Sequence, residues 1–195
     1  MPDIKKITRA RHADFRTREE GEDLIVEGYF IVFNQPYESW CGVEEYVDPH
    51  AIDENTDTSD VRALTDHVSH LVLGRSTVGT LTYNIDDVGL FATIRINRRD
   101  LDAVNLHARV QRGDVDQASF GFYEDAVEWI DLPDGRAQRV IRHISKLMEV
   151  SVCTFPAYEQ TSVSARDRDS AAALKKELAA HKKENLKRRF KHHGT

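Results

Sequence analysis

The sequence predicts a mainly β fold with flanking helices (α+β), followed by a C-terminal helical tail. Three observations lead to this prediction. Several apolar runs are separated by turn-forming residues, as in antiparallel sheets. One segment near the middle of the chain changes to a helical period. After Val163 the composition shifts to Ala, Lys, Glu, Leu and Arg, which favours helix.

The first predicted strand is residues 24–33, which are rich in β-branched and aromatic residues, as in a strand buried on both faces. Gly28 permits a bend or bulge within it. The segment before it is polar and mixed in charge. Residues 35–60 hold turn formers and acids, so we expect an irregular segment with a short strand near 44–47. Another short strand is expected at 61–64.

A hairpin is predicted after this, with strands at 79–85 and 89–96 joined by the turn sequence Asp-Asp-Val-Gly. Its second strand alternates in polarity, which indicates a sheet with one solvent-exposed face. Further along the chain the pattern predicts a long strand or bent pair at 115–130 and strands at 139–144 and 146–154, the last ended by Pro156.

A helix is predicted over residues 99–112, because apolar side chains recur there at spacings of three and four. Its expected apolar face holds Leu101, Val104 and Ala108, with Leu106 and Val110 adjoining. Asn97 or Asp100 is expected near its N-terminus, and Gly113 at its end.

The predicted strands suit a closed or nearly closed antiparallel β-barrel, because closure removes exposed strand edges in a body of this size. A sandwich of two sheets fits the pattern almost as well. The chain has 195 residues, which we divide into a body at 1–165 and a basic helical or disordered tail at 166–195.

The charge is unevenly distributed between these two parts. The tail has ten Lys/Arg and four Asp/Glu, whereas the whole chain has a net charge of −6. We therefore do not expect the acidic body to bind nucleic acid. The basic tail could contact nucleic acid weakly or an acidic protein surface, although a solvated helix is the simpler interpretation.

Composition also bounds the environment and the chemistry. No apolar run approaches the ~20 residues needed to cross a bilayer, and no apolar stretch of a secretory signal follows the start, so no membrane contact is expected. Cys41 and Cys153 suit a reducing compartment, with one bridge between them left open. There is no Gly-rich phosphate loop, CxxC or HExxH motif, and no cofactor is expected.

Three segments place polar groups among apolar neighbours. His67 and His70 lie three residues apart, unlike the i, i+4 pair of zinc hydrolases, so either a proton acceptor or an exposed loop explains them. Ser119 and Gly121 share one face of a predicted strand, where a small hydroxyl could meet another chain, although the pattern alone favours tight packing. Glu149, in a third segment, needs a partner, either an arginine or a histidine.

Four stretches of the chain, in order, resemble the prohead (procapsid maturation) serine proteases of tailed bacteriophages. They are an opening strand at 25–34, a histidine segment at 61–67 with 73–76 and 79–81, a serine segment at 112–114 with 118–122, and a closing segment at 147–152 with 154–158 and 161–163. The resemblance covers about residues 24–165. It implies a fold like that of herpesvirus assembly proteases, a β-barrel ringed by helices.

This resemblance also implies an activity and its residues. It implies a serine endopeptidase that cleaves capsid or scaffold polypeptides inside the immature phage capsid, in the host cytoplasm, often with self-cleavage. Carried over by position, Ser119 is the nucleophile, His67 the general base and Glu149 the third member. The family usually has Asn where this chain has Asp66. Asp66, beside His67, is a rival carboxylate, although adjacent side chains on a strand point apart, and His70 is a rival base.

Other interpretations stay open at this point. The chain could be a non-catalytic scaffold or capsid-assembly module of the same fold, or a metal-dependent hydrolase that uses His67 and His70. Arg75 could steady a substrate or an oxyanion. The sequence leaves homo-oligomer formation and the preferred cleavage site open.

Overall fold

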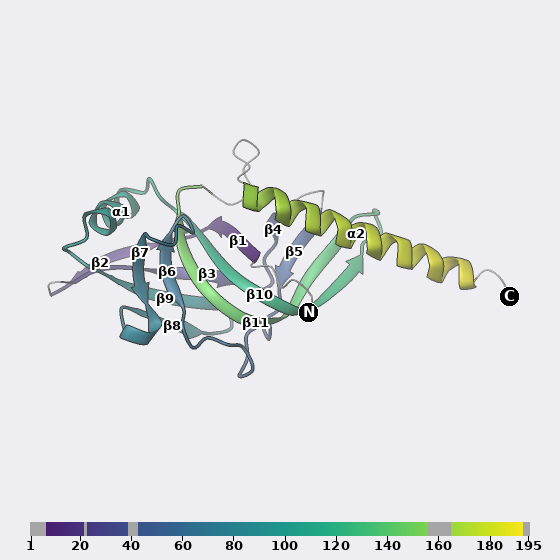
Figure 1. Ribbon diagram of the computed structural model, residues 1–195, viewed down its shortest axis with the longest axis horizontal. Coiled ribbons are helices and arrows are strands. Elements are labelled where there is room, and N and C mark those ends of the chain that lie inside the picture. Colours follow the sequence, from purple (N-terminus) through teal and green to yellow (C-terminus); the bar gives the residue numbers. More distant parts are fainter. Residues whose placement is uncertain (1–6, 22, 39–42, 156–164, 193–195) are drawn as a thin grey trace.

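The computed structural model describes residues 7–21, 23–38, 43–155 and 165–192. Two sheets make up the body, and two helices accompany them within the described ranges (Figure 1). This agrees with the predicted α+β class. Apolar residues from both sheets and from helix α1 (Leu101–Arg112) form one buried cluster, which is the core of the molecule.

The larger sheet has seven strands and contains the long hairpin of β10 and β11. Its order is β1 (Ile7–His12), β10 (Gln117–Asp131), β11 (Ala137–Cys153), β5 (Val43–Val47) and β4 (Tyr37–Glu38), with β6 (Arg62–Thr65) paired to β11 and β7 (Val72–Arg75) paired to β6. Strands β5 and β6 both pair with β11 in parallel. These two parallel pairings depart from the antiparallel barrel that the sequence predicts, although the other strand pairs are antiparallel. Parallel strands need a long connection between them, and both β5 and β6 are separated from β11 by a long stretch of chain.

The smaller sheet has four antiparallel strands. Their order is β2 (Arg16–Glu20), β3 (Asp23–Val32), β9 (Gly89–Ile96) and β8 (Leu81–Ile85). A short 3₁₀ turn, η2 (Ser76–Val78), precedes β8. The predicted hairpin at 79–96 is confirmed. Strand β1 and strand β2 were not expected, because their sequences are polar and lack a clear alternation.

Gly89, at the start of β9, lies where the β8–β9 hairpin turn meets strand β3. A Cβ atom at this position would lie 1.9 Å from the carbonyl oxygen of Ile31, so any other residue would push the two strands apart. Asp86 closes the turn, since its Oδ1 accepts from the backbone N–H of Val88 at 2.8 Å and of Gly89 at 3.0 Å. The turn residues thus fix the pairing of β9 with β3.

Helix α1 has the ends that the sequence predicts. The Asp100 carboxylate accepts from the backbone N–H groups of Asp102 and Ala103, and Gly113 ends the helix with a φ of 84°. Its predicted apolar face is only partly right, because Leu106 and Val110 are buried but Leu101 is 74% exposed. The buried side chains are Ala103, Leu106, His107 and Val110, which face strands β2, β3 and β9. The strands against which the helix packs, and not the helical period alone, determine which of its side chains are buried.

The closed or nearly closed barrel is not confirmed. Among the described residues, strand pairing gives two sheets whose paths do not close on themselves. The two strands predicted at 139–144 and 146–154 form one continuous strand, β11. The strand predicted at 115–130 is the single strand β10, whose bends are register shifts between Gly121 and Val127. Barrel closure stays a prediction.

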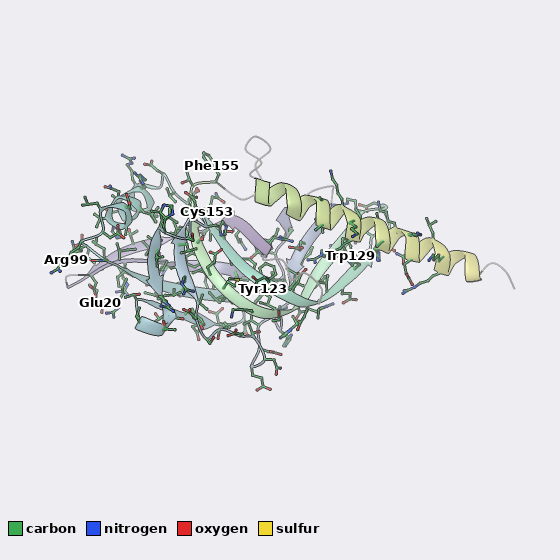
Figure 2. All side chains as sticks on the ribbon, in the orientation of Figure 1. Glu20, Arg99, Tyr123, Trp129, Cys153 and Phe155 are labelled. Carbon is green, nitrogen blue, oxygen red and sulfur yellow. The ribbon has the colours of Figure 1, made fainter. Side chains whose placement is uncertain are left out.

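Helix α2 (Ala165–His192) lies along the half of the β10–β11 hairpin that is next to its turn, and it projects beyond the hairpin (Figure 1). Glu177 pairs with Arg139 at 3.2 Å. The His181 ring stacks on Trp129, which is labelled in Figure 2, with centroids 5.4 Å apart. Leu174 is buried. The tail is therefore docked on the body along part of its length. The division into a body at 1–165 and a tail at 166–195 stays a prediction.

Some predicted features fall on residues that the structure does not describe. Pro156 and Cys41 lie outside the described ranges. Cys153 is a buried free thiol. The bridge to Cys41 that the sequence left open involves a residue outside the described ranges. In the part of the chain that the structure describes, neither helix has the length and apolar character needed to span a bilayer.

Asp100→Ala removes the N-cap of α1 and leaves the N–H groups of Asp102 and Ala103 without this acceptor. We expect the free energy of unfolding to fall by about 1 kcal/mol. Chemical denaturation followed by circular dichroism measures it. Asp102→Ala, in the same helical turn, is the control and should have a smaller effect. Equal losses in the two variants would argue against the cap.

Candidate active site

The β10–β11 hairpin brings small and acidic side chains onto one face of the larger sheet. Ser119 is opposite Ser151, and Gly121 is opposite Glu149. Because side chains alternate along a strand, Phe120 and its even-numbered neighbours lie on the other face, in the core. Ser119 and Glu149 thus share a face, as the sequence pattern predicts.

His67 reaches this face from the loop after β6. Strand β6 pairs in parallel with β11, with Leu64 opposite Ser151. The chain then turns sharply, because Asp66 and His67 have φ angles of 48° and 60°. Two consecutive residues in this left-handed region cost roughly 1–2 kcal/mol each. Such strain persists only where the surrounding contacts hold it, and it is concentrated at functional sites.

Several hydrogen bonds hold this turn against β11. The N–H of Asp66 donates to the Val152 carbonyl at 3.0 Å. The Asp66 carboxylate accepts from the backbone N–H of Thr154 at 2.8 Å and from its hydroxyl at 3.2 Å. The N–H of His67 donates to Ser151 Oγ at 3.3 Å. These contacts aim the His67 ring at the hairpin face.

The three predicted site residues come together in one hydrogen-bonded row. Nε2 of His67 lies 2.7 Å from Oγ of Ser119, and Nδ1 of His67 lies 2.6 Å from Oε1 of Glu149. Ser119 is 0% exposed and Glu149 is buried, whereas the His67 side chain is 19% exposed. The imidazole therefore bridges a hydroxyl and a carboxylate that are both shielded from water.

Ser151 supports two members of this row, a role that the sequence alone did not assign. Its hydroxyl donates to Oε2 of Glu149 at 2.6 Å and accepts from the N–H of His67. The carboxylate is thereby held by the imidazole on one oxygen and by Ser151 on the other. The signal in the sequence is the alternation that puts Glu149 and Ser151 on one face.

The other residues that the sequence offered for the site, Asp66, His70 and Arg75, are not part of this hydrogen-bonded row. Asp66 binds Thr154, as described above, so its carboxylate anchors the loop. His70 is exposed. Arg75 forms two hydrogen bonds with Asp60, at 2.7 and 2.8 Å. Within the described ranges, the structure contains no group of three or more His, Cys, Asp or Glu side chains that could hold a metal ion.

Cys153 lies on the same face as Glu149 and Ser151, near the end of β11 (Figure 2). Burial, together with the negative charges of Asp66 and Glu149, raises the pKa of this thiol well above its ordinary value. A protonated, buried thiol is a poor nucleophile. Ser119, which contacts the imidazole, is the better candidate for the reacting group on this face.

A hydroxyl, an imidazole and a carboxylate in hydrogen-bonded order define the site of a serine hydrolase, whatever the order of these residues along the chain. A family model described as "Caudovirus prohead serine protease" matches residues 11–176 of the sequence. The chain belongs to this family of serine peptidases. The family resemblance that the sequence segments carry is confirmed.

Two known proteins are similar to this chain, one in sequence and one in fold. The prohead protease of Enterobacteria phage HK97 is 27% identical over 165 residues, which are 85% of this chain and 70% of that protein. The structure of the bacteriophage T4 capsid assembly protease matches with a TM-score of 0.54 and 12% identity, over 79% of this chain and 99% of that one. At this low identity, the second likeness supports the fold alone.

Ser151→Ala removes the donor to Glu149 and the acceptor for the His67 N–H. We expect kcat for peptide hydrolysis to fall by roughly tenfold or more, with little change in KM, because the supporting residue orients the row without touching substrate. The control is Ser145→Ala, on the same strand, whose hydroxyl binds the Tyr123 carbonyl. Steady-state kinetics test this, and an unchanged kcat would contradict the positioning role.

Proposed function

We propose that Ser119, His67 and Glu149 form the catalytic triad of an endopeptidase that cleaves capsid or scaffold polypeptides, and its own chain, during procapsid maturation. The observation that carries the proposal is the continuous row from Ser119 Oγ through the His67 ring to Glu149. This cleavage would take place inside the immature capsid, in the host cytoplasm. The proposal also includes that the sheets of this chain form a barrel like that of the herpesvirus assembly proteases.

The row supplies the groups for nucleophilic catalysis. His67 Nε2 accepts the hydroxyl proton as Ser119 Oγ attacks the scissile carbonyl carbon, and the imidazolium then donates this proton to the leaving amine. Water, deprotonated by His67, releases the acyl group from Ser119. Glu149 keeps the proton of the neutral ring on Nδ1 and stabilises the imidazolium that forms. Its own position is held by Ser151.

The burial of this row favours an enzyme over a non-catalytic scaffold module. A polar group taken out of water costs free energy unless it is hydrogen-bonded. If these positions only had to be packed, apolar side chains would fill them equally well. Reactive groups held in a water-poor site, in contrast, interact more strongly with a developing charge.

Ser119→Ala should abolish cleavage of capsid and scaffold chains and of the protein itself, because the attacking oxygen is removed. The fold should persist, since Ser119 is a small side chain on a strand paired on both sides. Mass spectrometry after incubation with the capsid protein measures cleavage, with Ser145→Ala as the control. Undiminished, time-dependent truncation by the Ser119 variant would reject the nucleophile.

Glu149→Gln keeps the shape of the side chain but replaces an acceptor oxygen with an NH₂ group. We expect kcat to fall by roughly four orders of magnitude, because the amide stabilises the wrong tautomer of His67 and cannot stabilise the imidazolium. Glu128→Gln, an exposed residue of β10 paired with Arg142, is the control. A loss of less than about tenfold would exclude Glu149 as the third member.

A further inference from the structure

Strand β1 occupies the edge of β10 at the position of Ser119. On one side, β10 pairs with β11 from Gln117 onward. On the other side it pairs with β1 in antiparallel orientation, with Ala10 opposite Ser119 (Figure 1). Both edges of β10 are therefore paired with other strands at the position of Ser119. An extended peptide that binds beside Ser119 by strand addition has to use the edge that β1 covers.

The backbone of β1 also contacts the nucleophile. The Ser119 hydroxyl lies 2.7 Å from the Arg9 carbonyl oxygen, the same distance that separates it from His67 Nε2. A hydroxyl has one proton, so it can donate to the Arg9 carbonyl or to Nε2 but not to both. A proton that points to Arg9 is not available to the general base. The contact with β1 therefore competes with the first step of the reaction.

The Arg9 carbonyl is not placed as a scissile group. In a productive complex the carbonyl carbon lies about 3 Å from the attacking oxygen, with the orbitals aligned. Here the carbonyl oxygen faces the hydroxyl and accepts its hydrogen bond. The strand thus lies where a substrate strand would lie, but in an unreactive orientation.

A buried ion pair anchors β1 in this position. The Arg9 guanidinium binds the carboxylate of Glu45, which is 0% exposed and also binds Arg139 at 2.7 Å. Burial by itself would raise the pKa of Glu45, but the two arginines hold it below its ordinary value. Glu45 is therefore ionised at neutral pH. When Arg9 leaves, Glu45 keeps its ion pair with Arg139, so it is not left without a cationic partner.

We propose that the edge of β10 at Gln117–Phe122 is the binding site for an extended substrate strand, and that β1 is an internal strand that blocks it until it is displaced. This inference rests on the proposed function, because it takes Ser119 as the nucleophile. The occupant that replaces β1 is an unfolded polypeptide segment, held by main-chain hydrogen bonds to β10. Release of β1 both opens this edge and frees the Ser119 hydroxyl for His67.

The test compares Arg9→Ala with Arg18→Ala in the full chain. Arg18 lies on β2 and forms exposed ion pairs with Glu20 and Glu27, so its loss leaves β1 in place. A small fluorophosphonate labels the reactive serine, and mass spectrometry measures the rate of Ser119 labelling. Loss of the Arg9 anchor should raise this rate by roughly tenfold, since a charge-assisted hydrogen bond contributes that order. Arg18→Ala should match the original chain.

A peptide added in trans separates release of β1 from general loosening of the fold. A synthetic peptide with the sequence of residues 5–14 should slow the labelling of Arg9→Ala, because it restores both the strand and its arginine. The same peptide with alanine at the Arg9 position should have a much weaker effect. Equal effects of the two peptides would overturn the role of the anchor.

A disulfide lock covers the case in which Arg9→Ala fails to fold. Arg11 and Ala118 are directly opposite on β1 and β10, so Arg11→Cys with Ala118→Cys can bridge the strands. The oxidised protein should be labelled at Ser119 at least about tenfold more slowly than the reduced protein. Equal rates in both states would overturn the proposal.

The outcomes distinguish this proposal from the function on which it rests. Labelling of Ser119 at one rate in the original chain, in Arg9→Ala and in both states of the lock would reject the blocking strand and leave the nucleophile assigned. Absence of labelling at Ser119 in every folded variant would reject the nucleophile, and the blocking strand with it.

Discussion

The register of β10 against β11 is the constraint on which the site depends. Ser119 opposite Ser151 and Gly121 opposite Glu149 place the hydroxyl and the carboxylate on one face. A slip of one residue would turn Ser119 into the core and Phe120 out of it, because side chains alternate with a period of two. The large buried side chains on the opposite face therefore keep the register, and the parallel pairing of β6 with β11 then brings the His67 loop to the same place.

A network of charges around the buried Arg139 connects the remaining elements to this hairpin. Arg139 on β11 binds Glu45 on β5, Glu124 on β10 and Glu177 on α2. Burial raises the pKa of Glu124, although Arg139 opposes the shift. Buried charges are tolerated only when each has its partners, so the network restricts how these strands and α2 can be placed. Arg9 joins it through Glu45, which connects the position of β1, and so access to Ser119, to the packing of the whole sheet.

The sequence predicted those elements whose signal is local. Strand β3, the β8–β9 hairpin with Gly89, and α1 with Asp100 and Gly113 at its ends were all predicted close to their observed bounds. Strands β1 and β2 were missed because they are polar, and their place depends on the strands they join. The buried face of α1 was predicted only in part for a related reason, since the sheet beneath the helix decides which side chains are covered.

From the residues alone, the sequence could determine that Ser119 and Gly121 share a face, that Glu149 shares one with Ser151, and where turns and caps lie. These properties follow from strand alternation and from backbone groups within a few residues. Only the tertiary structure decided that Asp66 anchors a loop, that His67 reaches both partners and that β1 covers Ser119. Those contacts join residues 52, 82, 88 and 110 positions apart, and such contacts form through packing that no local pattern specifies.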